Sequence, residues 1–206
     1  MMKKILWLLI FLLPVMAFAE EACSVCGGTS DQCLTDDIGA VYCSGTLVSY
    51  PEGRAASYYA VREGTVMIGE GAFRDCTNLE IINFPDSLLI IADEAFYGCT
   101  ALRYVNGQEL PPNLYALGSW AFAGCSSLYE LDVKAAVRFI GDGAFAASGL
   151  TDLYLYSTQF VYGMNVIPEK RVTIHMPGEY PSAVISGFVA DHAGMVLRFD
   201  LAEEDW

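Results

Sequence analysis

"IGEGAFRDCTNL", from Ile68 to Leu79, is a phrase that this chain contains four times. It returns as "IADEAFYGCTAL" (Ile91 to Leu102), as "LGSWAFAGCSSL" (Leu117 to Leu128) and, shortened, as "IGDGAFAASGL" (Ile140 to Leu150). The shared Ala-Phe pairs are 23, 26 and 23 residues apart, and the longer spacing comes from "NGQELPP" (Asn106 to Pro112). Such a period is typical of stacked units that each bury an apolar face against the next copy. The sequence therefore predicts a repeat solenoid with its core along the stack.

Each copy contains two short apolar runs, one on either side of its Ala-Phe pair. The run after the shared leucine alternates apolar and outward residues, as at Leu131 and Val133, which predicts a strand buried on one face. The other run precedes the pair, as at Leu88 to Ile91 and Val137 to Ile140. The segment between the runs is too short for a long helix and favours a single helical or 3-10 turn. We expect these turns to insert a ladder of buried phenylalanines, namely Phe73, Phe96, Phe122 and Phe145.

These phrases resemble the BspA-like type of leucine-rich repeat, as in "VRFIGDGAFAASGLTDLYL" (Val137 to Leu155). The resemblance extends from about Gly45 to "RVTIHMP", which ends at Pro177. The fold class expected is an α/β-type solenoid, a right-handed leucine-rich-repeat coil with short parallel strands and short helical or 3-10 turns. The family resemblance implies exported or surface proteins that bind other macromolecules, including host matrix proteins in some adhesins. This chain differs from the large adhesins in its few repeats and in having no visible wall anchor.

The first residues are typical of a secretory signal peptide. A basic start, Met1 to Lys4, precedes an apolar run, Ile5 to Met16, and the small residues of Ala17-Phe18-Ala19. The run is shorter than the roughly 20 residues that span a bilayer. The carboxylates before Cys23 do not suit lipid attachment. We therefore expect residues 1–19 to be removed, giving a chain that starts near Glu20 and is extracellular, on the cell surface or in the periplasm.

The formal charge of the chain is −14. An acidic surface repels phosphate backbones, so nucleic acid is a poor partner. A basic, matrix-type or cation-bridged protein partner fits better, although solubility alone also accounts for such a charge. No stretch after the signal peptide is long and apolar enough to span a membrane.

The seven cysteines fall into two groups. Four crowd the cap that we assign to residues 20–44, namely Cys23, Cys26, Cys33 and Cys43. In an oxidising compartment they are expected to form disulfides, with three pairings open. A redox pair at Cys23 and Cys26 or a zinc site is the alternative, but the context and spacing favour neither. The cysteines of the repeats, Cys76, Cys99 and Cys125, are expected to be buried free thiols.

Catalytic signatures are absent from the sequence, so we expect no enzyme, cofactor or metal. The two histidines are His175 and His192. Asp191 adjoins His192, but adjacent side chains point in different directions and no nucleophile turn is present. Both histidines are more typical of core or surface positions than of a catalytic site.

The best candidate surface is the outward row of the strands in the repeats, assigned to residues 45–160, ahead of a last strand and C-terminal cap at 161–206. Residues two and four beyond each shared leucine are Ile81 and Asn83, Tyr104 and Asn106, Glu130 and Asp132, and Asp152 and Tyr154. Parallel strands place equivalent residues about 4.8 Å apart, which predicts an acidic patch flanked by Tyr104 and Tyr154. The hypothesis is a protein-binding or adhesion-type module that uses this face. The alternative is a structural or assembly component of the cell envelope without catalytic activity.

Overall fold

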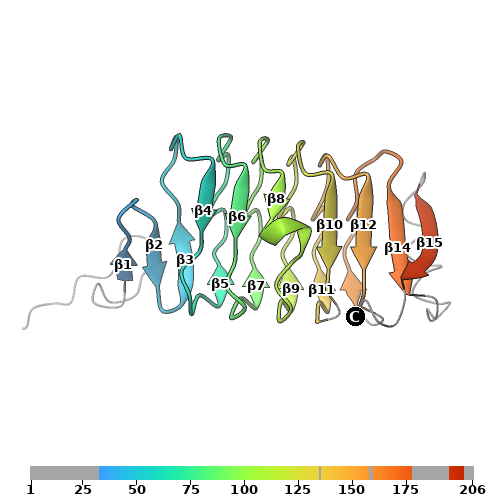
Figure 1. Ribbon diagram of the computed structural model, residues 1–206, viewed down its shortest axis with the longest axis horizontal. Coiled ribbons are helices and arrows are strands. Elements are labelled where there is room, and N and C mark those ends of the chain that lie inside the picture. Colours follow the sequence, from blue (N-terminus) through green and yellow to red (C-terminus); the bar gives the residue numbers. More distant parts are fainter. Residues whose placement is uncertain (1–32, 135, 158–159, 178–194, 202–206) are drawn as a thin grey trace, which may run out of the picture.

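The computed structural model describes residues 33–134, 136–157, 160–177 and 195–201, and it shows a solenoid built almost entirely of short strands (Figure 1). The expected signal peptide, Cys23, Cys26 and His192 lie outside the described residues, as does the apolar run Ala183 to Val189, which the sequence favours as a strand or short helix of the C-terminal cap. Each repeat contributes one strand to each of two long faces, and the core lies between them.

One face is a single eight-stranded sheet in the order β1-β2-β3-β5-β7-β9-β11-β13. Its strands are β1 (Cys33–Thr35), β2 (Val41–Cys43), β3 (Thr46–Ser49), β5 (Met67–Ile68), β7 (Ile90–Ile91), β9 (Ala116–Leu117), β11 (Phe139–Ile140) and β13 (Val161–Tyr162). From β3 onward all neighbours are parallel. The apolar runs before the Ala-Phe pairs therefore form strands, an assignment that the sequence left open.

The other face consists of two sheets. A three-stranded sheet contains β4 (Tyr58–Ala60), β6 (Ile81–Asn83) and β8 (Tyr104–Val105), and a four-stranded sheet contains β10 (Glu130–Val133), β12 (Asp152–Leu155), β14 (Thr173–Pro177) and β15 (Val196–Leu201). Both sheets are parallel throughout. The last strand that the sequence predicts at 171–177 is confirmed as β14, and the apolar run at 195–201, which the sequence left open as a strand or a short helix, forms β15.

The extra residues of the middle repeat cause the break in this face. They form a short 3-10 turn, η2 (Asn106–Gln108), which lies across the gap between β8 and β10 (Figure 1). All three residues have φ between +53° and +91°, a region that a strand cannot use. A single bridge between Glu109 and Asp132 is what joins the two sheets here.

The predicted phenylalanine ladder is confirmed. Phe73, Phe96, Phe122 and Phe145 are fully buried. Their rings stack nearly parallel, with centroids 4.9, 5.1 and 5.9 Å apart along the series. The backbone joins these positions as well, because the N–H of each of the first three donates to the alanine carbonyl of the next Ala-Phe pair. Phe96 and Phe122 are thus held by ring contacts on both sides and by their own amides.

The expectation of an α/β-type fold is not supported, because η2 is the one helix in the described residues. The Ala-Phe segments form turns closed by i to i+3 bonds, such as Arg74 N–H to Gly71 O. Left-handed residues lie on both sides of each phenylalanine, as at Glu94 (φ +55°) and Gly98 (φ +72°) around Phe96. A right-handed helix cannot continue through such residues. The fold is therefore a parallel β-solenoid, and the handedness of its coil remains a prediction.

Glycine at the first position after several strands lets the coils approach closely. A Cβ on Gly118 would lie 2.5 Å from the carbonyl carbon of Ala92, and one on Gly141 would lie 2.4 Å from the amide nitrogen of Ser119. Real Cβ contacts are never this short, so the spacing between these coils depends on the missing side chain.

A disulfide-bonded hairpin precedes the parallel stack. β1 and β2 are antiparallel, and Cys33 lies opposite Cys43 and is bonded to it. β2 then pairs antiparallel with β3, whose other edge begins the parallel series. The expectation of a disulfide in the N-terminal cap is confirmed for this pair. Cys76, Cys99 and Cys125 are free and buried, also as predicted.

Candidate functional site

The register of the four-stranded sheet brings most of the predicted site together. Glu130 lies opposite Asp152, and Asp132 lies opposite Tyr154, on the neighbouring parallel strands β10 and β12. These four residues are therefore adjacent, as the repeat spacing predicts. We refer to Glu130, Asp132, Asp152 and Tyr154 as the acidic face.

Strand β14 adds a histidine that the sequence reasoning did not include. His175 lies opposite Tyr154, and its ring stacks on the tyrosine with the centroids 4.2 Å apart and the planes at 10°. Nε2 of the same ring lies 3.1 Å from Oδ1 of Asp152. The buried histidine thus holds both a tyrosine and a carboxylate of the acidic face in fixed positions, which reduces the entropy lost when a partner contacts them.

Asp132 belongs to a second group of charges. Nζ of Lys134 lies 3.8 Å from Oδ2 of Asp132 and 3.4 Å from Oε2 of Glu109. The ammonium group also lies 5.0 Å from the centroid of the Tyr156 ring. Partial burial raises the pKa of the Asp132 carboxyl; Lys134 opposes this rise, and Glu109 and Glu130 add to it. Lys134 therefore neutralises part of the acidic face from within.

Glu130 differs from the other carboxylates of the acidic face because it is exposed and has no ion pair within the described part of the chain. Glu130 is therefore available to a partner, whereas Asp132 is paired with Lys134 and Asp152 already contacts His175.

The two remaining predicted residues lie apart from the acidic face. Tyr104 is exposed on β8, in the three-stranded sheet, and its strand neighbour is Ile81. The expectation that Asn106 continues the outward row of the strand is wrong. Asn106 begins η2, and its Oδ1 accepts a hydrogen bond from the backbone N–H of Phe84. The prediction of an acidic patch with a tyrosine at each end therefore fails on the Tyr104 side, because η2 separates the sheets.

Lys134, His175 and Glu109 complete this surface, and the site predicted from the sequence did not include them. Glu109 lies in the insertion "NGQELPP", outside the counted strand positions. Lys134 ends the β10 phrase beyond the two counted positions, and His175 lies on a strand that no longer carries the Ala-Phe phrase. The outward position of "TIHM" could have identified His175, because strand residues alternate between faces.

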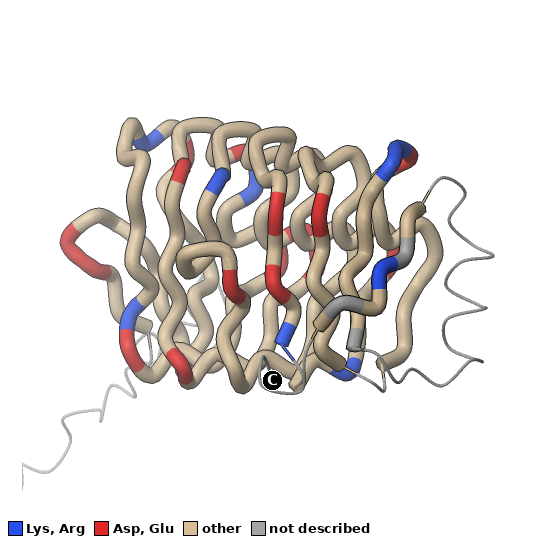
Figure 2. The backbone as a smooth tube through the Cα atoms, turned by 45° about the vertical axis from the view of Figure 1, so that its right-hand side comes forward, with Lys and Arg blue, Asp and Glu red and all other residues tan. Residues whose placement is uncertain are grey.

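Charges are distributed along the whole stack (Figure 2). The figure shows Asp and Glu positions recurring on successive coils, with fewer Lys and Arg among them. This distribution agrees with the formal charge of −14. The acidic face is thus one part of a generally acidic molecule, and its geometry, rather than its charge alone, distinguishes it.

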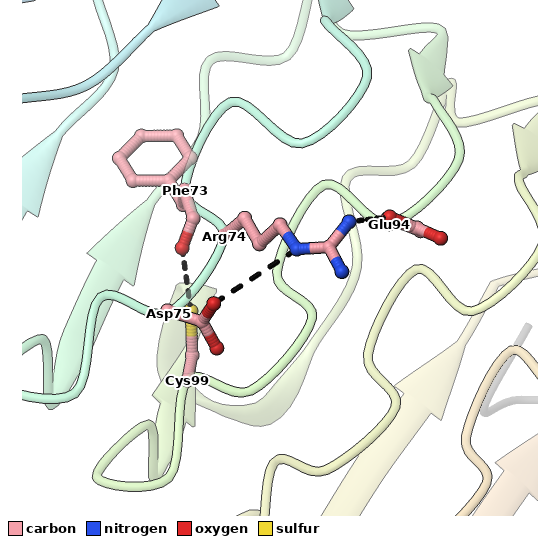
Figure 3. A network of polar contacts seen from close by, with 5 residues as sticks. All are labelled: Phe73, Arg74, Asp75, Glu94 and Cys99. Atoms are coloured by element: carbon pink, nitrogen blue, oxygen red, sulfur yellow. Dashed lines mark hydrogen bonds and ion pairs between the residues drawn. The ribbon is translucent and has the colours of Figure 1, made fainter. Parts of the chain in front are cut away.

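One ion-pair cluster on the turns connects neighbouring coils (Figure 3). Nη1 of Arg74 donates to Oε2 of Glu94 on the next coil, and Nε lies 3.9 Å from Oδ2 of Asp75. Beneath this cluster the Cys99 thiol donates to the carbonyl oxygen of Phe73, with sulfur and oxygen 2.9 Å apart. All of these contacts satisfy groups within the stack, so the cluster is structural.

The buried thiols are poorly suited to nucleophilic or redox chemistry. Burial raises the pKa of Cys76 to about 11 and that of Cys125 to about 12, and a thiolate is the reactive form. No cluster of three or more His, Cys, Asp or Glu side chains in the described ranges could hold a metal ion. In the same ranges no helix has both the length and the apolar character needed to cross a membrane.

Six copies of the BspA type leucine-rich repeat region match residues 56–166. The chain belongs to the BspA-type leucine-rich repeat family. The resemblance seen in the sequence is therefore confirmed, with more copies than the four aligned phrases. No curated protein matches the chain.

Several solved structures share this BspA-type fold. The pneumococcal vaccine antigen PcpA is 15% identical, with a TM-score of 0.62 and a match covering 82% of this chain and 48% of PcpA. A leucine-rich cell surface protein from Faecalibacterium prausnitzii is 22% identical, with a TM-score of 0.54 and coverage of 84% and 39%. A leucine-rich repeat protein from Bacteroides ovatus is 17% identical, with a TM-score of 0.52 and coverage of 71% and 45%. This BspA-type chain spans less than half the length of each, and these identities concern the fold alone.

Proposed function

We propose that this BspA-type chain is a secreted, non-catalytic module that binds a protein partner through the acidic face. Glu130 carries the proposal, because it is an exposed carboxylate beside residues that the His175 stack already holds in place. A fixed surface with one available charge and a tyrosine ring suits protein recognition.

The partner is a basic protein surface. An Arg or Lys side chain that approaches Glu130 also meets the Asp152 carboxylate on the neighbouring strand. The overall charge of −14 attracts such a partner over a distance that salt limits. The Tyr154 ring adds contact area next to these carboxylates, because it lies opposite Asp132.

The export of the chain is part of the same proposal. The basic start, the apolar run and the small residues before Glu20 support removal of residues 1–19. PcpA is described as a vaccine antigen and the F. prausnitzii protein as a cell surface protein, which is consistent with a location outside the cytoplasm. Mass spectrometry of the exported chain should give an N-terminus near Glu20, and a lipid-modified Cys23 or an uncleaved chain would contradict this part of the proposal.

The binding proposal is tested by capture from an envelope extract and from matrix proteins, followed by affinity measurements on the captured protein. Glu130→Gln should weaken binding more than Asp132→Asn, because the Asp132 charge is already balanced by Lys134. The triple variant that also carries Asp152→Asn should show a flatter dependence of affinity on salt. Tyr154→Ala should weaken binding more than any single charge change.

Glu52→Gln is a matched control, because Glu52 is exposed and follows strand β3 of the eight-stranded sheet. It should leave the affinity unchanged at physiological salt, where charges beyond about 8 Å are largely screened. Binding that survives every change on the acidic face would place the contact elsewhere. Irreversible incorporation into an envelope complex, with no dissociable partner, would favour a structural role instead.

A further inference from the structure

The outer side of the eight-stranded sheet carries a continuous row of exposed apolar side chains. The parallel register aligns Met67, Ile90, Ala116, Phe139 and Val161 as its outward positions. Backbone bonds from Leu89 to Val66 and from Tyr115 to Leu89 align a second row beside it. We call the exposed members the apolar stripe: Val66, Leu89, Ile90, Tyr115, Phe139 and Val161, whose side chains are 37 to 64% exposed.

The composition of the apolar stripe contrasts with the opposite side of the molecule. None of the five aligned outward positions from β5 to β13 carries a charge, whereas the acidic face has three carboxylates on two strands. Tyr115 and Phe139 meet edge to face with their centroids 5.3 Å apart, so the stripe has an aromatic centre. Contiguous exposed apolar surface of this kind is typical of interaction sites.

Carboxylates border the apolar stripe. Three exposed carboxylates each lie two residues after the last residue of a strand of this sheet, namely Glu70 after β5, Asp93 after β7 and Asp142 after β11. Two of them are fixed, since Oδ1 of Asp93 accepts from the Ser119 N–H and Oδ1 of Asp142 accepts from the Met164 N–H, both at 2.7 Å. Each carboxylate has a second oxygen that can accept a hydrogen bond from a partner.

In the part of the chain that the structure describes, few Lys or Arg side chains adjoin the apolar stripe. Arg138 adjoins the stripe beside Tyr115, but its guanidinium donates to the Ser157 hydroxyl and to the Val137 carbonyl. On the other border Asp86, three residues before Leu89, is exposed. The apolar stripe is therefore an uncharged row between acidic borders.

We propose that the apolar stripe binds an amphipathic helix of a partner protein, with its apolar side in contact with the stripe and its Lys or Arg residues at the acidic borders. Neighbouring rungs of the stripe are about 4.8 Å apart. The turns of a helix repeat every 5.4 Å, whereas same-face residues of an extended segment are about 6.8 Å apart, so a helix matches the rungs better. Five rungs span roughly 19 Å, or about 13 helical residues.

The acidic charge of the chain favours a basic helix over a second copy of the chain or a membrane surface as the partner of the apolar stripe. A second copy of the chain has a formal charge of −14 and acidic borders of its own, so two copies repel each other. An anionic membrane surface is repelled for the same reason. A basic helix instead gains from both the apolar and the charged parts of the surface.

A synthetic helix provides the test on the full mature chain. The probe is a peptide of about 14 residues with leucines along one side and lysines along the flanks. One comparison peptide replaces lysine with glutamate, and another keeps the lysines but replaces leucine with serine. At about 0.15 M salt only the Leu/Lys peptide should bind measurably, because it alone satisfies both the apolar stripe and its borders.

Variants then locate the contact. Ile90→Ser combined with Phe139→Ser should weaken binding of the Leu/Lys peptide at least about tenfold. Leu34→Ser, at a more exposed apolar position on β1, should not. Glu130→Gln on the acidic face should also leave binding of this peptide unchanged, so failure here is distinguishable from failure of the acidic-face proposal. Unchanged thermal unfolding shows that the variants are folded, and an Ile90→Thr and Phe139→Thr pair replaces any variant that is not.

Several outcomes would overturn the proposal. Equal binding of the Ser/Lys peptide, or binding that survives the double variant, would show general charge attraction. A dimer in sedimentation that the double variant converts to monomer would make the stripe a self-interface. Binding to neutral phosphatidylcholine vesicles without binding of the Leu/Lys peptide would assign it to lipid.

Discussion

At the scale of single residues, Phe96 is the best test of the ladder, because it stacks on Phe73 and on Phe122 and is fully buried. Phe96→Ala should lower the free energy of unfolding by about 3–5 kcal/mol, through lost transfer energy and the cavity left behind. Phe139→Ala is the control, since this ring is 45% exposed, and it should cost less than about 1 kcal/mol. Urea denaturation of both variants measures the difference. A loss below about 1 kcal/mol for Phe96→Ala would contradict the core assignment.

The cysteines give a second prediction at this scale. Native protein should show almost no reaction with a thiol reagent at pH 8, because Cys76, Cys99 and Cys125 are buried and burial raises the pKa of each. Denatured, unreduced protein should show three thiols. Five thiols would mean that Cys23 and Cys26 are reduced, and rapid reaction of the native protein would mean that the stack opens easily.

At the scale of elements, the sequence predicted the strands well and the turns less well. Regular alternation identified the strands after the shared leucines, such as β6 after Leu79, because burial on one face imposes a period of two. The strands before the Ala-Phe pairs, such as β7, were recognised only as apolar runs. The helical component of the expected fold failed, because left-handed residues such as Glu94 and Trp120 interrupt any helix. A positive φ at Glu or Trp has no signal in sequence, since these residues rarely adopt it.

The spacing between elements yields a further prediction. Gly141→Ala should destabilise the chain by about 3 kcal/mol, because the new Cβ would meet the backbone nitrogen of Ser119 at 2.4 Å and force two coils apart. Ala116→Val adds more carbon on the outward side of the same sheet and should change stability by less than about 0.5 kcal/mol. Thermal unfolding compares the two. Equal stability of Gly141→Ala and the parent would show that the coils are not in close contact there.

At the scale of the whole molecule, the candidate site was only partly predictable. Glu130, Asp132, Asp152 and Tyr154 are adjacent because the repeat period fixes their register. The prediction for Asn106 was wrong, because the chain turns away from the strand at this residue to form η2. The repeat period shows that residues are inserted, but it does not show at which residue the strand ends. The apolar stripe was also missed, because Leu88 to Ile91 looks like continuous core although only its two ends are buried.

The net charge predicts how the whole chain responds to salt. With a formal charge of −14 and few ion pairs in the described ranges, repulsion among carboxylates should outweigh attraction in the folded state. The midpoint of thermal unfolding should therefore rise by several degrees between about 10 mM and 300 mM sodium chloride, as the Debye length falls from about 30 Å to less than 8 Å. Calorimetry at neutral pH measures it. A midpoint that falls with salt would show that attractive pairs dominate.

The turn η2 has a consequence for engineering. Its residues leave the strand path between β8 and β10, none of them is buried, and the coils on either side keep their stacked phenylalanines and their backbone bonds. The turn at Gly107, where a Cβ would meet nothing within 4 Å, is thus a natural insertion point for a foreign epitope. A peptide grafted there would be displayed beside the acidic face on a rigid carrier, and its length could vary without changing the phase of the repeats.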